Sequence, residues 1–181
     1  SGGFAATRVA DDGFAGNLGV AYALTESVRL VANLGEGLRT PNVFDLGTFG
    51  DRPGNRFNVP NPDLDSERVT TFDAGWKVLN DRLEGELIGY YSRYRDKITS
   101  VLTGEATDSG RLVVQSRNAA RLVLYGAEFS LRHRLSDSVE WRTQLTWTRG
   151  EETLEGDDHP ADRIPPLNGS AGITWRPATR W

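Results

Sequence analysis

The chain of 181 residues has no cysteine and no methionine, and it lacks long apolar runs. The missing cysteine excludes a disulfide framework and a cysteine nucleophile. No stretch approaches the roughly 18 apolar residues that would indicate a transmembrane helix. Ser1–Phe4 has neither the basic nor the apolar region of a secretory signal, so for an exported protein we expect a mature piece or an excised fragment. The net charge of −4 provides no basic surface, so nucleic acid is not an expected partner.

What the sequence does have is alternation of apolar and polar residues along most of its length. A strand that is covered on one face shows this period, and no segment sustains the helical period of about 3.6 residues. Between residues 139 and 149, for example, Trp141 and Leu145 share one face, while Arg142 and Gln144 share the other. The pattern predicts strands near residues 16–24, 28–39, 67–78, 83–95, 121–135, 139–149 and 167–176.

The connections between these strands alternate strictly between short and long. Short turns are expected at 25–27, 79–82 and 136–138, and long polar loops at 40–66, 96–120 and 150–163. A further short turn at Pro177–Arg180 would lead to an eighth strand at Trp181. An outer-membrane barrel has short periplasmic turns and longer extracellular loops, whereas a soluble sandwich mixes loop lengths. The sequence therefore predicts an all-β fold: an antiparallel up-and-down meander of about 7–8 strands that forms a segment of a transmembrane β-barrel.

Aromatic residues on the apolar face lie two or three residues from the short turns. In a barrel, amphipathic rings at this height form an interfacial girdle in the headgroup region. The alternative is that they belong to the core of a soluble β-sandwich acting as a binding module. Because all of them align at one end, we favour the girdle, whose predicted members are Tyr22, Trp76, Trp141 and Trp175.

The opposite face of the predicted strands is polar and charged. Extrapolation across the short turns places Lys77 opposite Glu84 and Arg134 opposite Glu140. Unpaired ions in a soluble core cost on the order of several kcal/mol each, whereas a hydrated lumen accommodates them. We therefore expect this face to point into the lumen.

A distinctive motif stands at the end of the second predicted strand. Gly37–Asn42 is followed by Asp45–Leu46 and then, across a loop rich in glycine, proline and asparagine, by Asn61–Leu64 and Glu67. Further elements follow in order: Thr71–Lys77, Tyr90–Tyr91, Asp96–Ile98, Asn118–Ala119, Tyr125–Glu128, and Arg163–Pro166 leading to Trp175. The ordered set covers roughly residues 15–176 and resembles the barrel of TonB-dependent outer-membrane receptors.

The resemblance implies a fold, a location and a set of partners. The chain would be a piece of a barrel of about 22 strands with a plugged lumen, located in the bacterial outer membrane. Such receptors take up scarce ligands, typically metal chelates such as siderophores, haem or cobalamin, with energy from the inner membrane. The implied partners are outer-membrane lipid, the plug domain and the remaining barrel strands of the full-length chain, a TonB-type energy transducer and a small metal-chelate ligand.

The plug and the transducer-binding segment of that family are not found in residues 1–181. We therefore expect a single barrel segment that is truncated at both ends. Such a segment cannot transport by itself, and its edges need to pair or close. A passive porin-like channel is the alternative membrane function, and a plug domain encoded upstream would exclude it.

Arg39 is the best single polar candidate for a functional role. It lies at the outer mouth of the lumen-facing row and would pair with an acidic wall, the plug or an anionic chelate, with a structural role favoured. The loops 40–66, 96–118 and 150–163 would form part of the ligand mouth. The candidate mouth and lumen residues are Arg39, Asn42, Asp45, Asp73, Lys77, Glu84, Glu86, Glu128 and Arg132.

Clusters that suggest metal binding or catalysis are scarce. Asp157–His159 with Asp162 offers carboxylates beside an imidazole, but without metal-site spacing it is interpreted as a solvated acidic loop. His133 falls on the lipid-facing row and is interpreted as an interface residue near a turn. No Ser/His/Asp arrangement is present, and no carboxylate pair has the fixed separation of glycoside hydrolysis. We expect no enzyme, no metal site and no cofactor.

Overall fold

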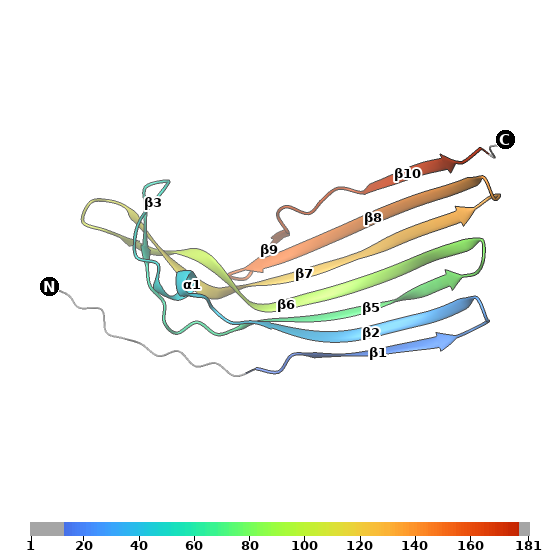
Figure 1. Cartoon of the computed structure of the whole chain (residues 1–181). Helices are drawn as coiled ribbons and strands as arrows, with labels where there is room; N and C mark the ends of the chain where they lie inside the picture. The colour runs from blue at the N-terminus through green and yellow to red at the C-terminus, as the bar shows by residue number, and fades with distance from the viewer. Residues whose placement is uncertain (1–12, 178–181) are drawn as a thin grey trace.

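A computed structural model describes residues 13–177 of the chain as one sheet of up-and-down strands (Figure 1). Each of these strands pairs antiparallel with the next, which confirms the predicted all-β meander. The predicted strand at Trp181, and most of the turn leading to it, lie outside the described residues. The strands of the wall are β1 Gly16–Ala23, β2 Val28–Arg39, β5 Glu67–Leu79, β6 Leu83–Ala106, β7 Leu112–Arg134, β8 Val139–Leu154 and β10 Asn168–Trp175.

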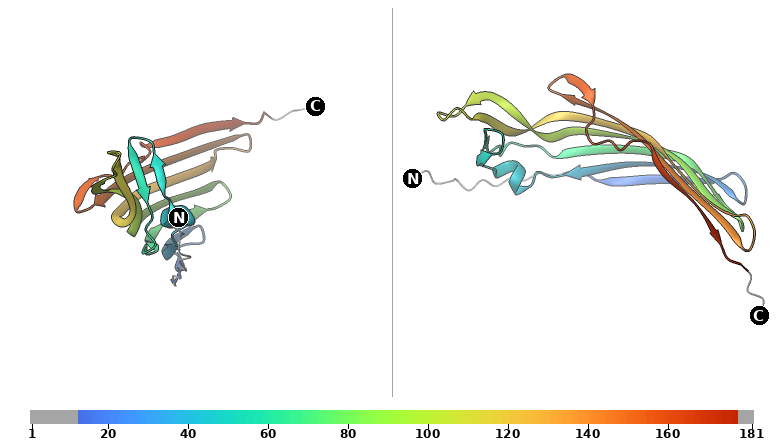
Figure 2. Two further views of the ribbon diagram at one scale, coloured as in Figure 1. Left: turned by 90° about the vertical axis from the view of Figure 1, so that its left-hand side faces the viewer. Right: turned by 90° about the horizontal axis from the view of Figure 1, so that it is seen from above.

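The sheet forms a curved, twisted wall with its short turns gathered at one end (Figures 1 and 2). No second layer covers its apolar face within residues 13–177, so large apolar side chains are open there: Leu18 is 78% exposed and Ile173 is 73% exposed. A soluble sandwich would bury these residues between two sheets. The single layer therefore contradicts the sandwich alternative and leaves the apolar face for lipid.

The short turns are closed by side-chain hydrogen bonds that fix their positions. Asn80 Oδ1 accepts from the backbone N–H groups of Arg82 and Leu83 at 3.0 and 2.9 Å. Ser136 Oγ accepts similarly from the N–H of Val139 at 3.1 Å. Asparagine and serine favour turns because their side chains bond to nearby backbone groups in this way.

The register across the β5–β6 turn differs from the predicted one. Lys77 faces Glu86 rather than Glu84, and Glu84 faces Leu79. The reason is the position of the turn: it begins at Asn80, whose side chain and backbone N–H both bond across it, so Leu79 still belongs to the strand. Across the β7–β8 turn the predicted register is confirmed.

The loop end of the wall is more ordered than the sequence predicts. β6 and β7 continue as a projecting hairpin, so most of the predicted loop 96–120 is strand. Pairing is irregular between Tyr94 and Ile98, and polar residues on both faces of the hairpin remove the alternation that marks a half-buried strand. The predicted loop 150–163 likewise contains the end of β8 and the strand β9 Asp157–Pro160.

The predicted loop 40–66 also contains regular structure. It forms α1 Val43–Gly47 and the hairpin of β3 Gly50–Arg52 and β4 Arg56–Val59, and β4 pairs in parallel with the start of β7. No helix among the described residues is long and apolar enough to cross a membrane. The buried apolar side chains belong to this end of the molecule: Leu64, Val101, Val113, Val114 and Ala120.

Candidate functional site

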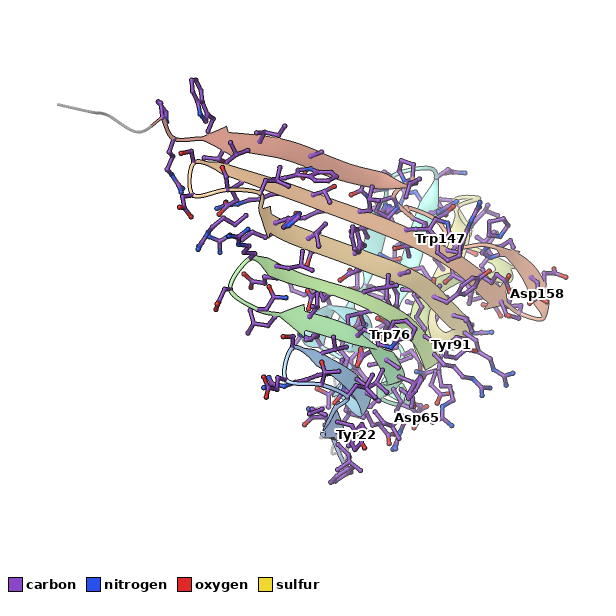
Figure 3. All side chains as sticks on the ribbon, turned by 90° about the vertical axis from the view of Figure 1, so that its right-hand side faces the viewer. Tyr22, Asp65, Trp76, Tyr91, Trp147 and Asp158 are labelled. Carbon is purple, nitrogen blue, oxygen red and sulfur yellow. The ribbon has the colours of Figure 1, made fainter. Side chains whose placement is uncertain are left out.

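The register sorts the side chains of the wall into two faces, because residues paired across the strands point to the same side. Tyr22, Trp76, Tyr91 and Trp147 lie on one face, which is otherwise mostly aliphatic between them and the short turns (Figure 3). The opposite face carries asparagine, serine, threonine and most of the candidate charged residues. We refer to the polar side as the lumen face and to the apolar side as the outer face.

Arg39, at the end of β2, is the centre of an ion-pair cluster at the mouth. Its guanidinium binds Glu67 of β5 through two parallel bonds, Nε to Oε2 at 2.9 Å and Nη2 to Oε1 at 2.8 Å. Its Nη1 donates to Asp45 Oδ2 in α1 at 2.8 Å. The planar fork of arginine matches a carboxylate in this bidentate geometry. We call Arg39, Asp45 and Glu67 the mouth clamp.

The mouth clamp joins further elements because both of its carboxylates have additional partners. Asp45 Oδ2 also accepts from the N–H of Asn42 at 3.0 Å, and Asn42 Oδ1 accepts from the first turn of α1, which completes a capping box. Glu67 Oε1 accepts from the N–H of Ile98 at 2.8 Å. Of the three partners expected for Arg39, the structure shows the acidic wall. Contact with a plug or a chelate stays a prediction.

Asn118 of β7 forms a second link at the mouth, for which sequence reasoning assigned no role. Its Oδ1 accepts from the N–H of Asp65 at 2.9 Å, and its Nδ2 donates to the carbonyls of Asp65 and Asp96 at 2.9 and 2.7 Å. Lys97 also pairs with Glu152 at 2.5 Å. The sequence does give one signal for Asn118, because this residue is among the elements of the motif. The Lys97–Glu152 pair joins residues 55 apart in the sequence, and it follows only from the strand pairing.

Charged side chains of the lumen face are linked again near the short turns. Lys77 Nζ lies 2.9 Å from Glu86 Oε2, as the corrected register requires. Arg132 lies between two carboxylates: its Nη1 is 3.5 Å from Glu84 Oε2, and its Nε is 3.1 Å from Glu140 Oε2. The structure therefore brings four of the predicted lumen residues into two neighbouring ion-pair groups. We refer to Lys77, Glu84, Glu86, Arg132, Glu140 and Arg142 together as the turn-end network.

Glu140 was recognised in the sequence as a cross-strand partner but not as a centre of this network. Its side chain is only 5% exposed, and it binds both Arg132 and, at 2.6 Å, Arg142. Arg134 faces Glu140 in the register, as predicted, yet no ion pair joins them. Long side chains reach diagonal neighbours as easily as direct ones, so the register alone does not determine which pair forms.

The remaining two lumen candidates lie between the mouth clamp and the turn-end network. Asp73 Oδ2 accepts from Asn33 Nδ2 at 3.0 Å, and these residues face each other on β5 and β2. Glu128 is exposed and forms no hydrogen bond or ion pair with another described residue. Its carboxylate is therefore open to whatever occupies the lumen.

The four predicted girdle aromatics all lie on the outer face. Their exposed fractions are 65% for Tyr22, 53% for Trp76, 40% for Trp141 and 69% for Trp175. Tyr22 and Trp76 share one register row, whose member on β8 is Leu145, four residues from Trp141. Barrel strands are tilted, so residues at equal membrane height need not share a row. The common height of the four rings stays a prediction.

The acidic segment near the end of β8 is part of a strand rather than the predicted loop. Asp158 accepts from Thr153 Oγ1 at 2.6 Å, and His159 Nδ1 lies 3.2 Å from the carbonyl oxygen of Pro160. His133 lies on the outer face near a short turn, where the sequence placed it. Among residues 13–177, no group of three or more acidic, histidine or cysteine side chains is arranged to hold a metal ion.

A charged lumen face, an open apolar face with aromatic rings, short turns at one end and interlocked loops at the other define a segment of an outer-membrane β-barrel. The sequence model of the family described as "TonB dependent receptor-like, beta-barrel" matches residues 1–181. The chain belongs to this family, whose barrels lie in the bacterial outer membrane and whose members are transport receptors rather than enzymes.

Two curated relatives come from Pseudomonas aeruginosa. The ferric enterobactin receptor is 24% identical over 168 residues, which are 83% of this chain and 22% of the relative. The ferric enterobactin receptor PirA is 24% identical over 178 residues, which are 91% of this chain and 24% of the relative. The chain therefore spans about a quarter of the length of these relatives.

Two solved structures show the same fold. The hemophore receptor HasR of Serratia marcescens, in complex with its hemophore HasA and heme, has a TM-score of 0.74 and 17% identity, with 90% of this chain and 29% of the neighbour covered. The copper transporter OprC has a TM-score of 0.67 and 23% identity, with 89% and 24% covered. At these identities the likeness shows the fold alone.

Proposed function

We propose that the chain forms part of the wall and mouth of an outer-membrane receptor for the energised uptake of a scarce metal chelate. The ordered mouth carries this proposal. The mouth clamp and Asn118 bond the segment 40–66 to β2 and β7, and the same residues link these strands to β5 and β6, through charge-assisted and backbone hydrogen bonds. A surface that is held rigid before binding loses less conformational entropy when a ligand arrives, so a fixed mouth suits selective capture.

A ferric siderophore is the ligand class that we favour, with haem and cobalamin as the alternatives. Two curated relatives are ferric enterobactin receptors, and many ferric chelates are anionic. The β3–β4 hairpin at the mouth carries the exposed guanidinium groups of Arg52 and Arg56. Such groups attract anions and donate bidentate hydrogen bonds to oxygen ligands.

Energy would come from a TonB-type transducer that acts on a plug domain of the full-length receptor. The wall has polar groups that a plug could contact. Glu128 is exposed on the lumen face, and the turn-end network lies on the same face near the short turns. A passive porin-like channel would have the same wall but would need neither plug nor transducer. The energy requirement therefore separates the two functions.

The proposal is tested by uptake of radiolabelled ferric enterobactin into siderophore-deficient bacteria that carry the full-length receptor. We expect uptake that stops when the transducer is deleted or the proton gradient is collapsed. We expect Arg52→Gln/Arg56→Gln to weaken uptake several-fold, with Glu26→Gln in the β1–β2 turn as the matched control. Uptake that persists without the transducer would support the passive channel. No uptake of ferric enterobactin, together with transducer-dependent uptake of haem or cobalamin, would overturn the ligand class.

A further inference from the structure

We propose that arginine side chains on the outer face, at the loop end of the wall, bind the phosphate groups of the phosphorylated glycolipid of the outer leaflet. The outer arginine patch consists of Arg68, Arg93, Arg95, Arg121 and Arg149. This site is separate from the lumen and from chelate uptake, since its residues point to the opposite side of the sheet.

The outer arginine patch follows directly after a row of aromatic rings. Tyr91, Tyr125 and Trp147 lie on the outer faces of β6, β7 and β8; Tyr91 faces Tyr125 in the register, and the Tyr125 and Trp147 rings meet edge to face with centroids 6.0 Å apart. Arg149 shares the register row of Tyr125 and lies two residues beyond Trp147 toward the loops, and Arg93 follows two residues after Tyr91. Aromatic rings of barrels mark the membrane interface, so the arginines lie at the level of headgroups.

The charge distribution on the outer face is strongly asymmetric. From the row of Trp147 to the short turns, the outer face of the described strands carries no arginine, lysine, aspartate or glutamate. Its titratable side chains there are Tyr22 and His133. The cations are therefore confined to the end that bears the long loops, which in an outer-membrane barrel is the extracellular end.

Most of these guanidinium groups have no partner among residues 13–177. Arg93, Arg95, Arg121 and Arg149 are exposed and form no hydrogen bond or ion pair with another described residue. Arg68 has a long contact of 4.0 Å with an outer-face glutamate of β2. Unpaired guanidinium groups beside hydrocarbon are unfavourable unless an anion reaches them.

Three acidic side chains share this end of the outer face, so the patch is not uniformly basic. Glu36 contacts Arg68, Glu151 lies two residues beyond Arg149, and Asp158 accepts a hydrogen bond from Thr153. Five arginines against these three carboxylates leave an excess of positive charge. A phosphate suits this excess, because the planar arginine fork binds phosphate through two parallel hydrogen bonds.

The side of the membrane on which the outer arginine patch lies determines which lipid reaches it. A phosphorylated glycolipid of the outer leaflet presents its phosphates at the extracellular interface, where the aromatic row and the outer arginine patch meet. An inner-leaflet phospholipid presents its phosphate at the turn end, where the outer face of the described strands has no arginine or lysine. The position of the patch thus selects the outer-leaflet lipid.

The test uses the purified full-length receptor in nanodiscs that contain bisphosphorylated lipid A, dephosphorylated lipid A or phosphatidylglycerol, with bound lipid measured by native mass spectrometry. The variant Arg93→Gln/Arg149→Gln removes two charges of the patch. The matched control, Arg29→Gln/Arg134→Gln, removes two exposed charges from the lumen face near the short turns, where neither side chain bonds to another described residue. Heat-modifiable migration confirms that each variant folds, and single Arg149→Gln replaces the double variant if that one does not.

We expect the wild-type receptor to retain bisphosphorylated lipid A at least about tenfold better than the dephosphorylated form. The outer-face variant should lose about tenfold in this retention, because charge-assisted hydrogen bonds are lost, while the lumen-face control should match wild type. Equal retention of the two lipid A forms, an equal loss in the control, or equal retention of phosphatidylglycerol would each overturn the proposal. Chelate uptake does not enter this readout, so the proposed function is tested separately.

Discussion

Replacing Glu67 by alanine is the most informative perturbation of the mouth. The substitution removes two hydrogen bonds from Arg39 and the acceptor of the Ile98 N–H. The Glu67 side chain is 14% exposed and that of Arg39 is 45% exposed. We therefore assign this ion pair the stabilisation typical of surface pairs, about 0–1 kcal/mol. The bond from Ile98 to a carboxylate adds about 1.5–3 kcal/mol. Together they give about 1.5–4 kcal/mol of local stability, and because the pair is partly exposed we use a value near the lower end, about 2 kcal/mol.

Hydrogen exchange of the peptide that contains Ile98, in the full-length receptor, measures this local stability. Because about 1.4 kcal/mol corresponds to a tenfold change in an equilibrium, about 2 kcal/mol should speed exchange of the Ile98 amide by about 30-fold. Glu67→Gln keeps a neutral acceptor for Ile98 and should show a smaller effect. Arg39→Gln combined with Glu67→Ala should cost less than the sum of the single variants, since the two residues share one interaction.

Exchange in the β5–β6 turn provides the internal control, because Glu67 has no contact there. Faster exchange confined to the mouth is the expected result. If Glu67→Ala left the Ile98 amide as protected as in wild type, the clamp would not hold β6, and the rigidity that supports the proposed function would have to come from other contacts.

Three further predictions concern the wall. Asn80→Ala should lower the free energy of unfolding by about 1 kcal/mol in urea titrations in lipid, because two turn bonds are lost. Asp81→Ala should not, because the Asp81 side chain forms no hydrogen bond or ion pair with another described residue. In the same titration, Gly126→Ala should lower the free energy of unfolding by about 1–3 kcal/mol, because its Cβ would lie 2.6 Å from a tyrosine hydroxyl on β6 and closer still to a carbonyl on β8. Gly89→Ala is the control, because the nearest atom to its Cβ would be 3.8 Å away. In a variant whose only tryptophan is Trp76, lipids brominated near the headgroup should quench the fluorescence more than lipids brominated at the chain end. The reverse order would show that Trp76 does not belong to the girdle.

The wall was predictable from the sequence because lipid and water impose opposite demands on alternate residues. Each strand between short turns shows that alternation, and the order of short and long connections determined the meander. The error in pairing Lys77 with Glu84 came from one residue of the turn: the sequence does not show that Asn80, rather than Leu79, begins it. A local side-chain hydrogen bond is enough to shift every cross-strand pair between β5 and β6.

The mouth was less predictable because its order comes from contacts between distant segments. The residues after Asp96 on β6 carry no regular alternation, because polar residues lie on both faces of the projecting hairpin. Val101 and Val114 are nevertheless buried, and β4 of the segment 40–66 pairs with β7 at Val114. Glu67 and Asn118 appeared in the motif without a role. Their roles depend on which strand lies beside which, and that information belongs to the fold.

The assignment of the two faces is tested most directly by cysteine scanning along β8 of the full-length receptor in lipid. Residues 1–181 contain no cysteine, so each introduced thiol reports on one position of this segment. A membrane-impermeant maleimide should modify cysteine at positions 142, 144 and 146 and leave positions 141, 143 and 145 unmodified, because the first set faces the hydrated lumen and the second faces lipid. Modification without alternation, or alternation in the opposite phase, would contradict the account of this chain as a barrel wall.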